Sequence, residues 1–283
     1  MNILVTGADG YLGSAFSNFL RHNYNVISWD VDKNLFNLNF EQLRDMQVNA
    51  IVNFAVIADF SDLQVDIQKT YFNVNVKGVE HLTNLASKLG IPLVQISTRE
   101  VIGIRNFQIS ESENVPAFKG LKLVNEEEPC LPLHAYGKTK LIGEFIVLGY
   151  KYGSVIRLNT CYTDNIESRK GLIANLICKS KLDGVVTLDN GGLALRDPLH
   201  INDLAKLVIC ILSAKIYGQL FHAGGGEVNF INLKEICLGV NDAVKIIDGD
   251  NNSDRGFLMD ISKAKNILGW RPEIEIRKFI KFL

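Results

Sequence analysis

The stretch VTGADGYLGSAF, residues 5–16, decides the fold that we expect for this chain. A short apolar run precedes it, apolar residues follow it at helical spacing, and it contains three glycines: Gly7, Gly10 and Gly13. Between a strand and a helix, such glycines allow a tight bend, a close backbone approach to a pyrophosphate and close packing of the helix. The first N–H groups of the helix also attract anions. The stretch therefore predicts a dinucleotide-binding turn, with Tyr11 and Leu12 beside the ligand.

Short apolar runs alternate with helically periodic segments through the first 160 residues. The runs NVISWD, NAIVNFAV, PLVQIST and SVIRLNT are rich in apolar residues, which is typical of parallel strands covered on both faces. Right-handed crossovers then predict an α/β fold with a doubly wound parallel sheet of the Rossmann type. Because the alternation loosens after about residue 160, we expect a dinucleotide-binding domain over 1–160 and 199–223. A smaller C-terminal α/β substrate-binding region is expected over 161–198 and 224–283.

The composition argues against several classes of partner. The net charge is −1 over 283 residues, so no electrostatic argument favours a nucleic acid or an acidic membrane surface. No apolar run of 18 residues is present, and we expect no membrane span. The five cysteines are scattered and the five histidines lack metal-ligand spacing, so we expect free thiols and no metal site. The chain also leads directly into a strand without a basic leader, and we expect a cytoplasmic protein.

An acidic residue closes the second predicted strand, at Asp30 in VISWDVD. A carboxylate at this place accepts hydrogen bonds from the hydroxyls of the adenosine ribose and repels a 2′-phosphate. We therefore expect NAD as the cofactor rather than NADP. Asp32 is the alternative acid, although its position is more simply interpreted as an exposed turn.

A tyrosine and a lysine stand four residues apart at the start of a predicted amphipathic helix, as Tyr136 and Lys140 in HAYGKTKLIGE. This spacing places both side chains on one helical face. A lysine cation beside a phenol favours the phenolate, so we expect a lowered pKa for Tyr136 and a role in acid–base catalysis. An exposed tyrosine and lysine without function is the alternative interpretation.

Several motifs together resemble one family of enzymes. They are TGADGYLG, VNFAV, NVNVKGVEHL, ISTREVIG, YGKTKLIGE, LRDPLHINDLAKLV, FHAGGGEVNFINLKEI and DISKAKNILGWRP. In this order they resemble the extended short-chain dehydrogenase/reductases of the NAD-dependent epimerase/dehydratase family, which act mostly on nucleotide sugars. YGKTKLIGE is also similar to the dTDP-4-dehydrorhamnose reductases, whose chains are similarly short.

The resemblance implies roles for the residues that match the family's motifs. Tyr136 exchanges a proton with a sugar hydroxyl while a hydride moves to or from the nicotinamide. Lys140 binds the nicotinamide ribose, and Thr98 shares the hydrogen bond to the sugar hydroxyl. Further contacts with the cofactor are implied at three positions: Phe54, Ala55 and Asn75.

The resemblance also implies substrate contacts near the end of the dinucleotide-binding domain. Arg196 matches an arginine that binds the diphosphate of the sugar nucleotide, a task that suits a guanidinium fork. Thr160 stands three residues after Arg157, where many members have an asparagine that contacts the phosphates. Asn159 lies one residue earlier.

The strand end ISTREVIG departs from the family's dehydratases. In nucleotide-sugar 4,6-dehydratases a glutamate matching Glu100 abstracts the C5 proton, and an aspartate before it protonates the departing C6 hydroxyl. Here Arg99 takes the place of that aspartate, and arginine cannot act as an acid. Arg99 is instead expected to bind an anionic group of the substrate, to form an ion pair with Glu100, or to turn outward into a surface salt bridge.

Three hypotheses for the function follow. The first is an NAD-dependent epimerase or dehydratase that works through hydride transfer at a sugar carbon, C4 by resemblance. The second is a reductase of 4-keto-deoxysugar nucleotides that consumes NAD(P)H, and the third is a catalytically silent dinucleotide-binding subunit. The resemblance also implies a homodimer formed by the helices of VKGVEHLTNLASKLG and GKTKLIGEFIVLGYKYG.

Overall fold

A six-stranded parallel sheet forms the centre of the molecule in a computed structural model that describes residues 1–30, 34–58, 65–103, 123–249 and 256–283. The strand order is β10-β5-β4-β3-β1-β2. This confirms the predicted α/β fold with a doubly wound parallel sheet. The strands are β1 (Asn2–Thr6), β2 (Asn25–Trp29), β3 (Ala50–Asn53), β4 (Leu93–Thr98), β5 (Gly153–Leu158) and β10 (Gln219–Ala223).

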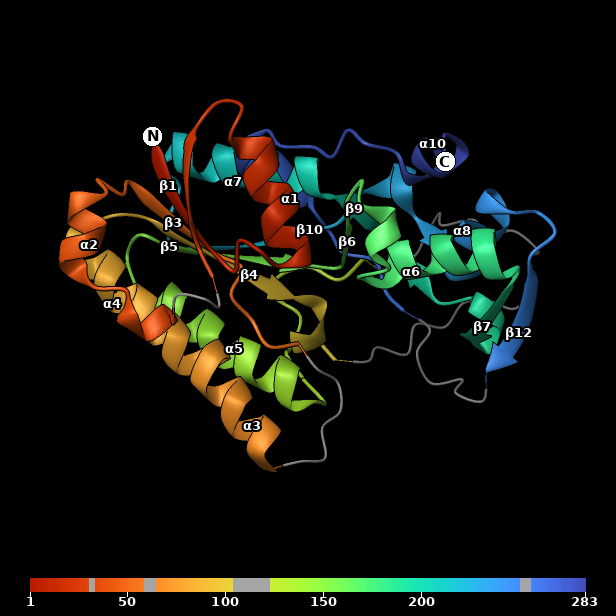
Figure 1. Ribbon diagram of the computed structural model, residues 1–283, viewed down its shortest axis with the longest axis horizontal. Helices are drawn as coiled ribbons and strands as arrows, with labels where there is room; N and C mark the ends of the chain where they lie inside the picture. The colour runs from red at the N-terminus through yellow and green to blue at the C-terminus, as the bar shows by residue number, and fades with distance from the viewer. Residues whose placement is uncertain (31–33, 59–64, 104–122, 250–255) are drawn as a thin grey trace.

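Helices cover both faces of this sheet (Figure 1). One face carries α1 (Tyr11–Leu20), α7 (Ile201–Ala214) and α9 (Ser262–Leu268), and the other carries α2 (Phe40–Asp45), α4 (Val79–Leu89) and α5 (Ala135–Leu148). Successive residues of β1 alternate between the two cores: Ile3 and Val5 pack with α1 and α7, whereas Leu4 packs with α4. The continuous apolar strands seen in the sequence therefore reflect burial on both faces.

The helix before α4 contains an irregular turn. α3 (Val65–Phe72) continues into a π-helical segment, Asn73–Gly78, and then into α4. A π turn adds a residue to the helical circuit and often marks a functional site. Here it buries Asn75, whose contacts are described below.

The remaining chain builds a second apolar core beside the carboxyl edge of the sheet. Its helices are α6 (Leu172–Cys178), which continues into a π-helical turn (Lys179–Asp183), α8 (Leu233–Val240) and α10 (Ile276–Lys281). Its strands form short pairs: β6 (Thr160–Tyr162) with β9 (Pro198–His200), β7 (Val185–Asp189) with β12 (Lys245–Gly249), and β8 (Leu195–Arg196) with β11 (Ile231–Asn232). Short 3₁₀ turns lie at Leu35–Asn37, Arg99–Val101, Ile166–Ser168, Asn190–Gly192 and Glu227–Asn229.

One part of the expected C-terminal region packs on the sheet instead. Ala264 of α9 and Trp270 belong to the core formed by α1 and α7. The indole Nε1 of Trp270 donates a hydrogen bond to the carbonyl of Asp203, 2.9 Å away on α7.

No helix within the described ranges is long and apolar enough to cross a membrane.

The glycine turn lies where the connections of the sheet diverge. The chain leaves β1 toward β2 on one side and returns to β3 on the other, and crevices at such switch points bind ligands. Gly7 has φ +70°, and a Cβ atom there would lie 2.6 Å from the backbone N of Ala55. A Cβ on Gly13 would lie 2.0 Å from the carbonyl oxygen of Gly7. Glycine at both positions therefore lets β1, β3 and α1 converge.

Gly7→Ala should destabilise the fold more than Gly90→Ala. Both glycines are left-handed, at φ +70° and +67°, but a Cβ atom on Gly90 meets nothing within 4 Å. The shared backbone cost is about 1–2 kcal/mol, and the clash with Ala55 should add about 1–3 kcal/mol. Urea unfolding of both variants measures the difference. Equal losses of stability in the two variants would contradict the close approach of Gly7 to the backbone of Ala55.

Candidate functional site

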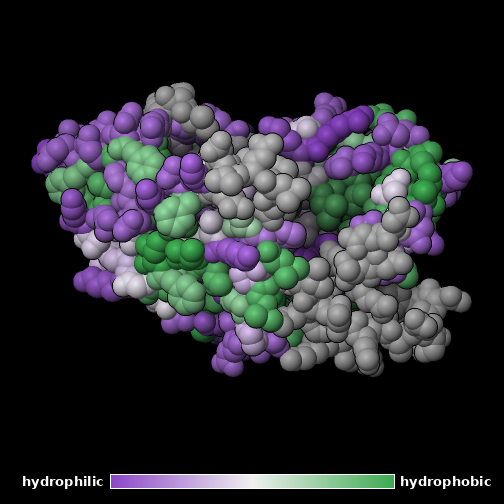
Figure 2. All heavy atoms as spheres, turned by 90° about the horizontal axis from the view of Figure 1, so that it is seen from below, coloured by the Kyte–Doolittle hydropathy of each residue, from purple (hydrophilic) through white to green (hydrophobic). Residues whose placement is uncertain are grey.

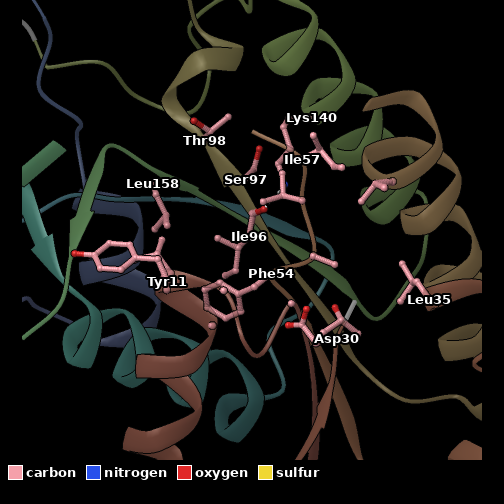
Figure 3. Close-up of a pocket in the computed structure, with 18 of the residues that line it drawn as sticks. Tyr11, Asp30, Leu35, Phe54, Ile57, Ile96, Ser97, Thr98, Lys140 and Leu158 are labelled. Atoms are coloured by element: carbon pink, nitrogen blue, oxygen red, sulfur yellow. Dashed lines mark hydrogen bonds between the residues drawn. The ribbon is translucent and has the colours of Figure 1, made fainter. Parts of the chain in front are cut away.

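A cavity of about 710 Å³ lies at the carboxyl edge of the sheet. Figure 3 shows Asp30 and Leu35 at one end of it and Thr98 and Lys140 at the other. The residues predicted from sequence that line it are Gly7, Gly10, Tyr11, Leu12, Gly13, Asp30, Phe54, Ala55, Thr98, Tyr136 and Lys140. The fold thus brings the glycine turn and the tyrosine–lysine pair to one cavity.

The glycine turn leaves the start of α1 open toward the cavity. Gly10 is the N-cap residue and provides no side-chain acceptor, so the first N–H groups of the helix remain available for an anion. The backbone N–H of Asp9 donates to Oδ2 of Asp30 over 2.5 Å, which ties the turn to the end of β2. A cradle without side chains, with an acceptor beside it, fits the pyrophosphate and ribose of a dinucleotide.

Beyond Asp30, the wall of the cavity is formed by residues that were not predicted from the sequence to bind a ligand. Asn34, Leu35 and Phe36 line this end. The Asn34 side chain accepts a hydrogen bond from the Phe36 N–H at 3.0 Å, which fixes the turn. Apolar side chains next to a ribose acceptor suit the flat face of a base. Their only signal in the sequence is an apolar pair shortly after the acidic strand end.

At the other end, Tyr136 and Thr98 meet through their hydroxyl groups. Tyr136 lies in the first turn of α5 and on the same face as Lys140, as predicted. The Thr98 hydroxyl also accepts a hydrogen bond from the Glu100 N–H at 3.3 Å, which caps the Arg99–Val101 turn. The strand end and the helix start are therefore joined at the end of the cavity opposite Asp30 (Figure 3).

The pKa of Tyr136 is shifted opposite to the sequence-based expectation. Burial raises it to about 12, and the charge of Glu100 adds to this, whereas the hydrogen bond with Thr98 acts against it. The Nζ of Lys140 donates to the carbonyl of Ile96 at 2.6 Å. Burial in turn lowers the pKa of Lys140 to about 8, opposed by the charge of Glu144. Near neutral pH the phenol is protonated and the amine is mostly charged.

Asn75 supports the cavity wall from behind and is not among the residues that line it. Its Oδ1 accepts from the Ile57 N–H and its Nδ2 donates to the Ile57 carbonyl, both at 3.0 Å. Nδ2 also lies 3.1 Å from the hydroxyl of Thr139 on α5. The asparagine thus fixes Ile57, which lines the cavity, against the helix that carries Tyr136.

Arg99 turns inward, so the expectation of an outward surface bridge is wrong. The residue is 8% exposed, its Nη1 donates to Oδ1 of Asn159 at 3.1 Å, and its guanidinium lies 4.2 Å from the ring centre of Phe257. Its Nε lies 3.8 Å from Oε1 of Glu100, so the expected ion pair is present. Planar stacking and hydrogen bonding suit a guanidinium held away from water.

Asn159 connects Arg99 to a buried carboxylate. Its Nδ2 donates to Oδ1 of Asp197 and, at 2.9 Å, to the Phe257 carbonyl. Burial raises the pKa of Asp197 to about 7, against hydrogen bonds from Met259 and Asn159 and the charge of Arg99. Asn159 itself lines the cavity. This network therefore joins the end of β5 to the segments that carry Asp197 and Phe257.

The remaining predicted residues do not line the cavity, as far as the described residues show. Thr160 is buried and its hydroxyl lies 3.4 Å from Oδ1 of Asn159. Arg196 is buried on β8, and its Nη1 donates to the Leu195 carbonyl at 2.8 Å. The Glu100 side chain is 35% exposed beside Arg99. Within the described ranges, no three His, Cys, Asp or Glu side chains could together hold a metal ion.

Comparison with known proteins identifies relatives over most of the chain. Residues 3–224 match the profile of the NAD dependent epimerase/dehydratase family. A dTDP-glucose 4,6-dehydratase of Streptomyces antibioticus is 27% identical over 312 residues, covering 96% of this chain and 88% of the relative. A putative UDP-glucose 4-epimerase of Methanocaldococcus jannaschii is 25% identical over 310 residues, covering 99% and 96%.

A solved structure also shares the fold. It is UDP-glucuronic acid 4-epimerase from Bacillus cereus, in complex with UDP-glucuronic acid and NAD. Its TM-score is 0.81 at 20% identity, and the superposition covers 99% of this chain and 97% of that chain.

Proposed function

Because the chain belongs to the NAD dependent epimerase/dehydratase family, it is an NAD-dependent enzyme, and we propose that it oxidises and re-reduces a nucleotide sugar at C4. The observation that carries this proposal is the meeting of Thr98, Tyr136 and Lys140 at the end of the cavity opposite Asp30. Family membership sets aside the hypothesis of a catalytically silent subunit. We place NAD along the cavity, with its adenosine end at Asp30 and its nicotinamide end at Tyr136.

In this proposal the protein supplies positioning and proton transfer. Bound NAD supplies the acceptor and donor of a hydride. The Tyr136 phenol exchanges a proton with the sugar hydroxyl, and the Thr98 hydroxyl, already hydrogen-bonded to that phenol, orients it. During oxidation the Tyr136 phenolate accepts the proton of the sugar hydroxyl, during re-reduction the phenol returns it, and the Lys140 cation stabilises the phenolate form. The raised pKa of Tyr136 favours its protonated form, which is the state that returns a proton when a keto sugar is reduced.

The arginine at position 99 favours epimerisation over 4,6-dehydration. The dehydration acid would have to act from the place that Arg99 occupies, and a guanidinium does not give up its proton. Glu100 remains beside Tyr136 as a candidate base, paired with Arg99. Net reduction of a keto sugar by free NAD(P)H is less supported, because the two relatives described above, which match 96% and 99% of this chain, are a dehydratase and a putative epimerase.

We also propose the homodimer expected from the sequence, formed through the face that carries α5 and the continuous helix of α3 and α4. Large apolar side chains are exposed there at Phe72, Ile142 and Phe145, the last to 70%. Figure 2 shows apolar side chains gathered on this side of the molecule. A cytoplasmic location is proposed as well, since all five cysteines are free thiols.

Tyr136→Phe should lower turnover about 100- to 10,000-fold, because it removes the proton-transferring hydroxyl. NAD affinity should stay within about twofold, because the ring remains. Incubation with UDP- and dTDP-hexoses, followed by NMR of the sugar region, measures conversion, and wild type should give a 4-epimer without net change in NADH absorbance. Unchanged sugars with wild type would overturn the proposed function. A stoichiometric loss of NADH with a 4-keto sugar would favour the reductase.

Asp30→Asn should weaken the discrimination against NADP. The amide oxygen still accepts from the Asp9 N–H, so the turn is kept, but the charge that repels a 2′-phosphate is lost. NADP affinity should rise roughly tenfold, since one near-surface repulsion is worth about 1–2 kcal/mol. Calorimetric titration with NAD and NADP measures the ratio of affinities. An unchanged ratio would assign the discrimination to other residues.

Phe145→Glu should convert the dimer to a monomer, because a charge in a buried apolar contact is not compensated. Phe282→Glu is the matched control, since Phe282 is 89% exposed at the end of α10 and outside the proposed interface. Sedimentation velocity of both variants and wild type measures their mass. A monomeric wild type at micromolar concentration would refute the proposed dimer.

A further inference from the structure

Three charged side chains lie buried together below the catalytic end of the cavity. Lys140 and Glu144 stand one turn apart on α5, and Arg157 reaches them from β5. Their exposed fractions are 4%, 1% and 4%. Charged groups are seldom buried unless they are paired and hydrogen-bonded. Glu144 is paired with Arg157, and Lys140 stands one turn away on the same face of α5.

The carboxylate of Glu144 is saturated by hydrogen bonds from two strands. The Nε of Arg157 lies 3.0 and 3.1 Å from its two oxygens, and Nη2 lies 2.6 Å from Oε2. The hydroxyl of Ser97 on β4 donates to Oε1 at 2.5 Å. Such a fork matches the geometry of a carboxylate. The orientation of the Glu144 side chain toward β4 and β5 is therefore fixed.

Lys140 is held on the same strand end. Its Nζ donates to the Ile96 carbonyl at 2.6 Å, next to the Ser97 that binds Glu144. A carbonyl alone does not compensate the loss of water around an ammonium group. The charge of Glu144 acts against the effect of burial on Lys140. The same carboxylate is paired with Arg157.

We propose that Glu144 is a positioning residue that keeps Lys140 charged, and that Arg157 sets the strength of this effect by competing for the carboxylate. The inference rests on the proposed function, in which a charged Lys140 binds the nicotinamide ribose and stabilises the phenolate of Tyr136. Glu144 touches neither cofactor nor substrate in this arrangement. Its effect on catalysis passes through Lys140.

The decisive test is a pair of substitutions with opposite expected signs. Glu144→Gln removes the negative charge while keeping an acceptor, and should lower the pKa of Lys140 by about one unit from its value near 8. Arg157→Met frees the carboxylate for Lys140 and should raise that pKa by a similar amount. The measurement is NMR titration of ¹³Cε-labelled lysine in cofactor-free protein, assigned with Lys140→Met.

Controls separate this effect from structural damage. Asp203→Asn alters another fully buried carboxylate, on α7, which accepts the N–H groups of Glu273 and Ile274 at 2.8 Å. It should lower stability and leave the titration of Lys140 unchanged. Glu144→Asp keeps the charge and should restore most of the wild-type pKa. If Glu144→Gln fails to fold, the upward shift in Arg157→Met still tests the proposal.

A second measurement links the titration to the cofactor. NAD affinity should fall as pH rises through the pKa of Lys140, so the midpoint should move down in Glu144→Gln and up in Arg157→Met. Shifts of Lys140 in the same direction for both variants, or none in either, would overturn the proposal. If the shifts appear but no nucleotide sugar is converted, the role of Glu144 stands and the proposed function fails.

Discussion

The site depends on the lack of a side chain at Gly7. A Cβ atom there would lie 2.6 Å from the backbone of Ala55, so β1 and β3 converge at their carboxyl ends only with glycine at this position. Gly13 brings α1 to the same point, since it leaves room for the Gly7 carbonyl. The Asp9 N–H then reaches Asp30 at the end of β2. One turn thus aligns three strands and a helix around the place where connections diverge, and the cavity forms there.

The opposite end of the cavity is built by polar contacts between α5 and β4 at intervals of one helical turn. Tyr136 meets the Thr98 hydroxyl, Lys140 donates to the Ile96 carbonyl, and Glu144 accepts from Ser97. These three residues of α5 lie on one helical face because they are spaced four apart. Their partners are three consecutive residues at the end of β4. Tyr136 is therefore held in place by contacts that continue into the buried Glu144–Arg157 pair. The contacts between α5 and β4 therefore set both the positions of these side chains and the charges that surround them.

Local patterns predicted the parts of this protein that local physics determines. The glycine turn, the apolar strands and the Tyr136–Lys140 spacing each depend on a few neighbouring residues. The inward turn of Arg99 could not be predicted, because Asn159 and Phe257 lie 60 and 158 residues further along the chain. The raised pKa of Tyr136 depends on burial, which the sequence does not express. Asn75 was predicted from its motif, but its hydrogen bond with Ile57 was not. That contact depends on the π-helical segment that buries Asn75, and the sequence pattern does not indicate this segment.

Arg99 connects the fold to the outcome of the proposed reaction. A buried guanidinium needs acceptors and a counter-charge, and Asn159, Glu100 and the ring of Phe257 surround it. Asp197 lies behind Asn159 with a pKa already raised to about 7 by burial. An aspartate at position 99 would lose the positive charge that opposes this shift and add a second carboxylate nearby. The buried network and a dehydration acid at that position therefore exclude each other. Under the proposed function, a sugar oxidised at C4 keeps its C6 hydroxyl, and the open routes are hydride return to either face or proton exchange next to the ketone.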